Sequence, residues 1–180
     1  MIILIGGPSC SGKTYLAQKV LERYKIPYLS IDHIKMGLIR SNNSQGLTPY
    51  DDNKLTAFLW PIIKEIIKTN IENEQSIIIE GCYLPYSKIY SFTDNYKKKI
   101  IILYLVFSKN YIDNNYKDII NNSSIIEDKK DLTHITKTYL YQEHKSVKEK
   151  CEKYKIPYIH IDKNFKTDIK KAFALIDRFI

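Results

Sequence analysis

Apolar residues in this chain gather in five short runs, and the segments between the runs show helical periodicity. The runs cover residues 2–5, 28–31, 76–80, 100–107 and 158–161. Between them, apolar positions recur every three or four residues, most clearly over residues 51–71, as on one face of an amphipathic helix. Strands that alternate with helices in this way predict an α/β fold, with a parallel sheet covered by helices on both faces.

Several boundaries of these helices carry specific signals. Aspartates that precede helical stretches are expected to act as N-caps: Asp32, Asp51 or Asp52, and Asp131. Pro61 lies inside the longest stretch and is expected to kink or split that helix. A short helix is expected over residues 86–95, and a last helix over residues 165–180. The phrase Tyr-Lys-Ile-Pro-Tyr occurs at residues 24–28 and again at 154–158, which indicates one helix-to-strand junction used twice.

No linker interrupts this alternation, so the 180 residues are predicted to form a single domain. No apolar stretch approaches the length that crosses a bilayer, and the first apolar run ends in a glycine-rich segment, unlike a secretory signal. We therefore expect a cytoplasmic protein without membrane contact. The cysteines, Cys10, Cys82 and Cys151, show neither metal-ligand spacing nor a disulfide framework.

The first apolar run leads directly into that glycine-rich segment. It consists of Gly7, Pro8, Ser9, Cys10, Ser11, Gly12, Lys13 and Thr14. This matches the phosphate-loop pattern of Gly, four variable residues, Gly, Lys and Ser or Thr. In that pattern the glycines let backbone N–H groups turn toward an anion, Lys13 can reach the β- and γ-phosphates, and Thr14 can offer its hydroxyl to Mg²⁺. Because a strand precedes the loop and an amphipathic helix follows it, the sequence predicts a nucleoside triphosphate site.

Carboxylates follow two other predicted strands. Ligands of open parallel sheets gather at the carboxyl ends of the strands, where Asp32 and Glu80 are expected to lie. Phosphoryl transfer needs a carboxylate for the metal and a group that orients the attacking hydroxyl. Asp32 is the candidate general base or orienter, and it can also reach Mg²⁺ through water. Glu80 is the candidate carboxylate that reaches Mg²⁺ through water or binds the substrate.

The formal charge of +8 raises the question of a nucleic-acid partner. The lysines, however, are spread along a chain that is also rich in Ile, Asn and Tyr, which indicates a general composition more than a basic patch. The clearest run, residues 97–99, precedes a predicted buried strand and is typical of a solvated turn. Nucleic acid is therefore not the partner that we expect, although polyanion binding stays open as an alternative.

Together the motifs resemble those of small P-loop kinases. The similarity rests on the phosphate loop, on residues 30–34 with Arg40, and on residues 78–81 with Leu84 and Pro85. The chain is most similar to the 2-phosphoglycerate-kinase-like and zeta-toxin-like groups of the adenylate-kinase-like superfamily, over nearly its whole length in element order. This resemblance implies a three-layer P-loop NTPase fold whose five-stranded parallel sheet has the order 2-3-1-4-5.

The resemblance also implies how the domain divides its tasks. About residues 33–75 would hold the phosphate acceptor, and about residues 108–131 would form a small lid over ATP. The loop of residues 162–164 would lie near adenine. Within the site, the resemblance implies that Lys13 and Thr14 bind the phosphates and Mg²⁺. It also implies that Asp32 interacts with the acceptor hydroxyl and that Arg40 interacts with the charge of the acceptor.

The lid segment departs from the pattern of such kinases, which bring arginines onto the transferred phosphoryl group. The arginines of this chain lie elsewhere, at positions 23, 40 and 178. Lysines would have to take their place: Lys117, Lys129 and Lys130. A lysine is a point charge without the bidentate fork of arginine, so the lid raises a question about the strength of catalysis.

The sequence as a whole predicts an ATP- and Mg²⁺-dependent kinase that phosphorylates a hydroxyl or phosphate of a small molecule, which Arg40 suggests is anionic. One alternative is a nucleotide or polynucleotide kinase, which the basic charge favours. The other is an ATP-binding regulatory module with weak or no transfer, which the arginine-poor lid favours. A GTPase is disfavoured because the chain has no Asn-Lys-x-Asp motif.

Overall fold

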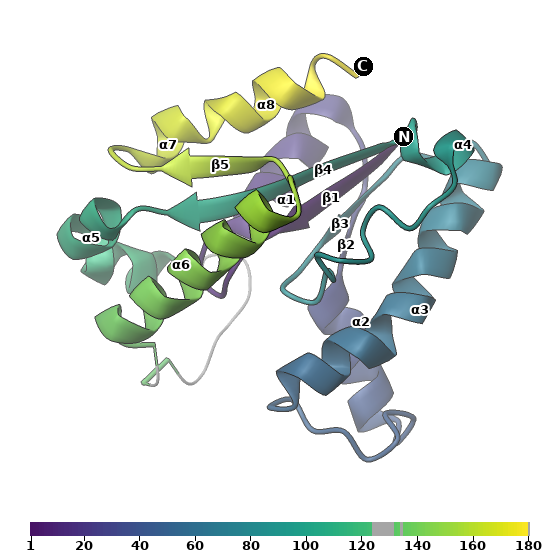
Figure 1. The fold of residues 1–180 in the computed structure, drawn as a ribbon, viewed down its shortest axis with the longest axis horizontal. Coiled ribbons are helices and arrows are strands. Elements are labelled where there is room, and N and C mark those ends of the chain that lie inside the picture. Colours follow the sequence, from purple (N-terminus) through teal and green to yellow (C-terminus); the bar gives the residue numbers. More distant parts are fainter. Residues whose placement is uncertain (124–131, 134, 180) are drawn as a thin grey trace.

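The computed structural model describes residues 1–123, 132–133 and 135–179, and it shows a twisted sheet between two layers of helices (Figure 1). The strands are β1 (Ile2–Gly6), β2 (Tyr28–Ser30), β3 (Ile77–Glu80), β4 (Ile100–Phe107) and β5 (Tyr158–Ile161). Neighbouring strands are all parallel, and their order is β2-β3-β1-β4-β5. The predicted α/β architecture and strand order are therefore confirmed, and the chain has the P-loop NTPase fold.

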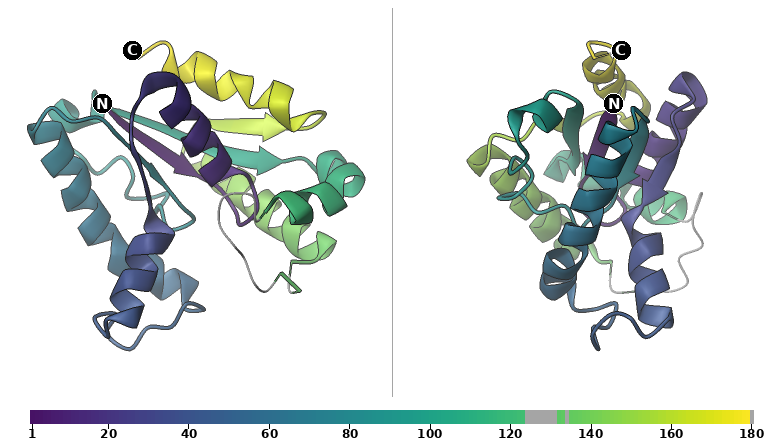
Figure 2. Two further views of the ribbon diagram at one scale, coloured as in Figure 1. Left: turned by 180° about the vertical axis from the view of Figure 1, so that it is seen from behind. Right: turned by 90° about the vertical axis from the view of Figure 1, so that its right-hand side faces the viewer.

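The helices cover both faces of this sheet. They are α1 (Lys13–Tyr24), α2 (Ile31–Arg40), α3 (Asp52–Glu72), α4 (Asp94–Lys97), α5 (Lys109–Asn122), α6 (Lys137–Lys153), α7 (Phe165–Asp168) and α8 (Lys170–Ile176). Alternate side chains of β1 enter two cores, one shared with α3 and α6 and the other with α1 and α8. Figure 2 shows α1 and α8 on the face that is turned away in Figure 1. None of the described helices is long and apolar enough to cross a membrane.

The longest helix, α3, runs without interruption through Pro61, so the predicted split is wrong. Pro61 is exposed, whereas Leu59, Trp60 and Ile63 beside it are buried. Packing of these neighbours against the sheet offsets the backbone hydrogen bond that a proline removes. The first half of α3 and the whole of α2 project from the sheet, with the connection of residues 41–51 at their tip (Figure 1). This pair of helices forms one side of the site described below.

The structure corrects two of the three predicted helix caps. Ser30 is the N-cap residue of α2, and Asp32 lies in the first turn of that helix, so the predicted cap at Asp32 is wrong. Asp51 is the N-cap residue of α3, as expected. The cap of α6 is Thr136, whose hydroxyl accepts a backbone hydrogen bond at 3.1 Å. Asp131, the predicted cap, lies outside the described residues.

The helix predicted over residues 86–95 is wrong as well, because residues 86–90 form turns, residues 91–93 have no regular structure, and only the short α4 follows them. Their apolar side chains act as separate anchors. Tyr86 stacks on Tyr104 with ring centroids 5.0 Å apart, while Ile89 and Phe92 are buried. The last predicted helix is divided into α7 and α8. The repeated junction is confirmed, since Lys25 and Lys155 each take a left-handed conformation after a helix, with φ of 58° and 55°.

Candidate functional site

The glycine-rich loop lies at the carboxyl end of β1, and its glycines take conformations that other residues rarely adopt. The φ angles of Gly7 and Gly12 are 147° and 86°. A Cβ on Gly7 would lie 2.8 Å from the Leu105 carbonyl oxygen, and a Cβ on Gly12 would lie 2.6 Å from the Phe165 ring. The loop can therefore pack this closely only with glycine at both positions.

Lys13 is buried at the centre of this loop, with 7% of its surface exposed. Its ammonium group donates a hydrogen bond of 2.8 Å to the carbonyl oxygen of Pro8. Burial alone would lower the pKa of this lysine. The pKa is nevertheless raised above its usual value, because three acidic groups lie nearby: Cys82, Glu80 and Asp32. Lys13 is thus a fixed positive charge surrounded by the ends of several elements.

Thr14 and Glu80 bring two oxygen ligands together beside Lys13. The hydroxyl of Thr14 donates to the Glu80 carboxylate at 3.3 Å, and Glu80 is 1% exposed. Glu80 is paired with Ile5 on one side and with Ser30 on the other, so it lies where β1, β2 and β3 end. Hydroxyl and carboxylate oxygens suit Mg²⁺, which takes one or two protein ligands and completes its shell with phosphates and water. No group of three or more His, Cys, Asp or Glu residues within the described ranges could hold a metal alone.

Ser11 and Cys82 complete the surroundings of the loop. The Ser11 hydroxyl is buried and has no hydrogen-bond partner among the described residues. Buried polar groups are normally paired, so an unpaired hydroxyl inside a phosphate-loop pattern fits a phosphate oxygen as its partner. The sulfur of Cys82 lies 4.0 Å from the hydroxyl oxygen of Ser9. Cys82 therefore lies against the phosphate loop, although its sequence position is remote from it.

A second polar network faces the loop from α2, α3 and the segment after β3. Lys35 forms an ion pair of 2.5 Å with Asp32 and donates a hydrogen bond of 3.0 Å to the Tyr83 hydroxyl. Tyr83 in turn donates to the Asp52 carboxylate at 3.1 Å. Burial, and then the charges of Asp32 and Asp52, raise the pKa of Tyr83, so this residue stays neutral. The network leaves Asp32 partly exposed, with 37% of its side chain accessible.

A cavity of about 410 Å³ extends from the phosphate loop toward α5 and α7. Its described lining includes aromatic side chains, of which the Tyr15 and Phe165 rings meet edge to face with centroids 5.6 Å apart. Phe107 lies 6.2 Å from Phe165, again at a steep angle. Aromatic rings beside a phosphate loop suit the flat base of a nucleotide. Residues 162–164, which the resemblance placed near adenine, lie just before Phe165 in the chain.

The remaining predicted site residues are Arg40, Lys117, Lys129 and Lys130. Arg40 is exposed on the last turn of α2, at the end opposite to Asp32. Lys117 is exposed on α5, while Asp118 on the same helix lines the cavity. Lys129 and Lys130 lie outside the described residues. The segment expected to form a lid begins with α5, whose buried residues are Tyr111, Ile112 and Ile119.

Sequence reasoning missed part of this site. Lys35 was detectable, because it follows Asp32 by three residues and therefore shares its face of a helix. Tyr83 and Asp52 carry no such local signal, since they meet only when the segment after β3 packs against α3. The aromatic cavity was likewise hidden, because Tyr15 and Phe165 come from opposite ends of the chain.

Comparisons with known proteins support the fold. No protein-family model and no curated protein matches the sequence. A deoxyadenosine kinase from M. mycoides has a similar structure, with a TM-score of 0.58 and 14% identity over 99% of this chain and 100% of that one. A gluconokinase from Sinorhizobium meliloti 1021 has a TM-score of 0.56 and 14% identity, over 98% of this chain and 91% of the gluconokinase chain. The shikimate kinase from Aquifex aeolicus has a TM-score of 0.55 and 14% identity, over 99% of this chain and 97% of the shikimate kinase chain. These similarities establish a fold shared with P-loop kinases, whereas the narrower resemblance to 2-phosphoglycerate-kinase-like and zeta-toxin-like groups stays a prediction.

Proposed function

We propose that this protein is a kinase that transfers the γ-phosphoryl group of ATP, with Mg²⁺, to a hydroxyl of a small molecule. One observation carries the proposal. The buried ammonium group of Lys13 lies beside Thr14, whose hydroxyl donates to the buried Glu80 carboxylate at 3.3 Å, and the charges of Glu80 and Asp32 help to raise the pKa of Lys13. These groups come from the phosphate loop, from the end of β3 and from the start of α2. Their convergence is what phosphoryl transfer requires of a protein: a phosphate-binding charge, a metal-side carboxylate and an orienting carboxylate.

On the nucleotide side, the loop backbone, Ser11 and Lys13 would bind the phosphates, and the aromatic cavity would bind the base. Thr14 and Glu80 would hold Mg²⁺, directly or through water. Bound Mg²⁺ neutralises charge on the phosphate oxygens during transfer. Lys13 is well placed to stay protonated throughout, because its raised pKa keeps the ammonium form at neutral pH. It therefore supplies positive charge without a proton transfer of its own.

On the acceptor side, Asp32 would orient the acceptor hydroxyl and receive its proton. Lys35 holds the Asp32 carboxylate through their ion pair of 2.5 Å, and this restricts its orientation. Asp32 is partly exposed, which leaves one of its edges accessible to a substrate. Arg40, on the distal turn of α2, is the candidate for binding an anionic group of an extended acceptor. About residues 33–75 would then form the acceptor-binding segment.

The region of about residues 108–131 is proposed as a lid that contributes lysines. Lys117 is the described member of this set, and it lies on α5 one position before the cavity-lining Asp118. A closing movement of the region would bring positive charge toward the γ-phosphate. Because lysine lacks the bidentate geometry of arginine, we expect slower transfer than in arginine-rich kinases.

Replacing Asp32 tests this assignment directly. Asp32→Asn keeps the size of the side chain but removes the charge that would orient and deprotonate the hydroxyl. We expect a small loss of stability because the ion pair with Lys35 is removed, little change in ATP affinity, and a transfer rate about a hundredfold to ten-thousandfold lower. The rate is measured as phosphoryl transfer to an acceptor identified by screening.

Asp94→Asn is the matched control, because Asp94 is 87% exposed on the short α4 and lies outside the network and the acceptor-binding segment. Its transfer rate should equal that of the wild type. Wild-type transfer by Asp32→Asn would remove Asp32 from the mechanism and leave Glu80 as the carboxylate to examine.

A further inference from the structure

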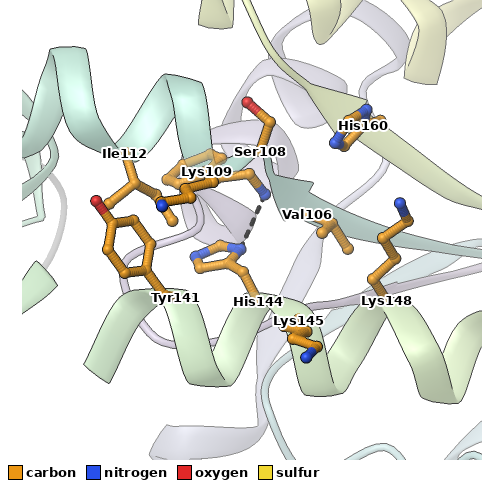
Figure 3. A pocket seen from close by; sticks show the side chains of 10 residues that line it. Val106, Ser108, Lys109, Ile112, Tyr141, His144, Lys145, Lys148 and His160 are labelled. Carbon is orange, nitrogen blue, oxygen red and sulfur yellow. Dashed lines mark hydrogen bonds between the residues drawn. The ribbon is translucent and has the colours of Figure 1, made fainter. Parts of the chain in front are cut away.

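A second cavity, of about 530 Å³, lies between α5, α6 and the carboxyl ends of β4 and β5. Figure 3 shows side chains from all four elements around it. Its inner wall includes the apolar side chains of Val106, Phe107 and Ile112. Phe107 also lines the aromatic cavity beside the phosphate loop, so the two cavities are neighbours that share one wall. Nothing in the proposed transfer of phosphate uses this second space.

A buried histidine, His144, is one of the lining residues, and its unsatisfied donor lies just beneath the surface of the cavity. The backbone N–H of Phe107 donates a hydrogen bond of 2.9 Å to Nδ1 of His144, drawn as a dashed line in Figure 3. The imidazole stacks on the Phe107 ring, with centroids 4.6 Å apart and an interplanar angle of 11°. Since Nδ1 accepts a hydrogen bond, the neutral ring must carry its proton on Nε2.

This Nε2–H group has no partner within the part of the chain that the structure describes, although His144 is only 1% exposed. Burial, and then the charge of Lys13, lower the pKa of His144 to about 3, which keeps the ring neutral at physiological pH. Buried donors in folded proteins are almost always paired. An unpaired one in a cavity wall therefore indicates an acceptor atom that a bound molecule would bring.

The charges around the cavity indicate the sign of that molecule. The lining includes the lysines Lys109, Lys145 and Lys148, and none of the lining residues within the described ranges is acidic. Lys145 and Lys148 have carboxylates on the outer side of α6, but both pairs are long, at 3.9 Å. Lys109 lies over the Tyr141 ring at 5.6 Å from its centroid. Three ammonium groups without a carboxylate among the lining residues favour an anion at this place.

We propose that this cavity binds a small organic anion with a flat apolar body. An oxygen of the ligand would accept the hydrogen bond from Nε2 of His144, and its negative charge would face the three lysines. The apolar body would pack against the ring of Tyr141, which is partly exposed in the lining. The site is separate from the nucleotide cavity and does not depend on the proposed kinase activity.

Benzoate is a suitable probe, because it combines one carboxylate with a flat apolar ring. It is titrated into the full-length protein while the imidazole nitrogens are followed by long-range ¹H–¹⁵N NMR. We expect affinity in the range of about 1 mM and a shift of the His144 Nε2 resonance that saturates with binding. The double variant K145Q/K148Q should bind about fivefold to tenfold more weakly, since each exposed charge contributes a modest factor.

The double variant K150Q/K153Q is the matched control, because it removes the same charge from the same helix outside the cavity. Its benzoate affinity should equal that of the wild type. Three results would overturn the proposal: no binding at about 20 mM benzoate, binding that leaves the His144 resonances unchanged, or equal weakening in the two double variants.

Discussion

At the scale of single residues, the candidate site combines one local loop with contacts between segments that are distant in the chain. The spacing of Gly7, Gly12 and Lys13 is set by backbone geometry within one loop, so a local motif records it. The contact of Lys35 with Tyr83, by contrast, joins two elements that are far apart in the chain. Such a contact depends on how helices pack on the sheet, and a single sequence does not encode that in a recognisable spacing.

Lys13→Ala tests the nucleotide side at this scale. The substitution removes a charge-assisted contact with phosphate oxygens, so ATP should bind about tenfold to a hundredfold more weakly. The fold should persist, because the ammonium group of Lys13 bonds to a carbonyl oxygen of the loop and is not part of the apolar core. Affinity is measured by calorimetry and stability by thermal melting. Lys19→Ala, on the exposed face of α1 where Lys19 pairs with Glu22, is the control and should bind ATP like the wild type. Unchanged affinity in Lys13→Ala would refute the assignment of the loop.

Cysteine alkylation gives an independent measure of the same site. Cys10 lines the nucleotide cavity and Cys82 lies against the loop, whereas Cys151 is fully buried. Burial, and then the charge of Glu152, raise the pKa of Cys151 to about 12, so its thiol should not react with iodoacetamide. Mg·ATP should slow alkylation of Cys10 and Cys82, as read by peptide mass spectrometry. Equal labelling of both with and without Mg·ATP would place the nucleotide elsewhere.

At the scale of elements, strands were predicted more accurately than helices. A run such as Ile100–Phe107 is apolar throughout because the strand is buried on both faces, and this leaves a strong pattern. The segment of residues 86–93 also has regularly spaced apolar side chains, yet they pack individually as anchors of turns. The effect of Pro61 was overestimated for a related reason, because tertiary packing stabilises α3 on both sides of it. Local patterns therefore fail where tertiary contacts determine the backbone.

The turn between β5 and α7 yields a prediction about pH. The Asp168 carboxylate accepts hydrogen bonds from the backbone N–H groups of Asp162, Lys163 and Asn164. Burial would raise its pKa, but these hydrogen bonds and the ammonium of Lys171 lower it from 3.8 to about 2. A lowered pKa stabilises the fold above the unfolded value of 3.8, and this contribution is lost as the pH falls toward about 2.

Asp168→Asn should therefore lower the free energy of unfolding by about 1 kcal/mol at pH 7, as measured by urea denaturation. The difference from the wild type should shrink from about pH 4 downward and be lost only as the pH falls below about 2. Asp94→Asn is the control, because Asp94 is 87% exposed and its ion pair with Lys97 is long, at 3.4 Å. A difference for Asp168→Asn that does not change with pH would contradict the role of its charge.

At the scale of the whole molecule, the strand order brings every proposed functional group to one edge of the sheet. β1 carries the phosphate loop, β3 ends at Glu80, and β2 leads into the helix that holds Asp32. These strands are neighbours in the sheet, although about fifty residues separate β2 from β3 in the sequence. The motifs implied this order through a family resemblance, while hydrophobic periodicity alone predicted only the layers. Neither the motifs nor the hydrophobic periodicity identifies the phosphate acceptor.

The most direct test of the central claim is a screen for the acceptor with Mg·ATP and the wild-type protein. ADP formation is followed while sugars, hydroxy acids, nucleosides and a total small-molecule extract of cells are added in turn. We predict that at least one addition raises ADP formation and produces a new phosphomonoester signal in ³¹P NMR, and that Asp32→Asn abolishes both. ATP binding that depends on Lys13, together with background ADP formation in the presence of every acceptor and of the extract, would contradict a kinase and indicate a nucleotide-binding module.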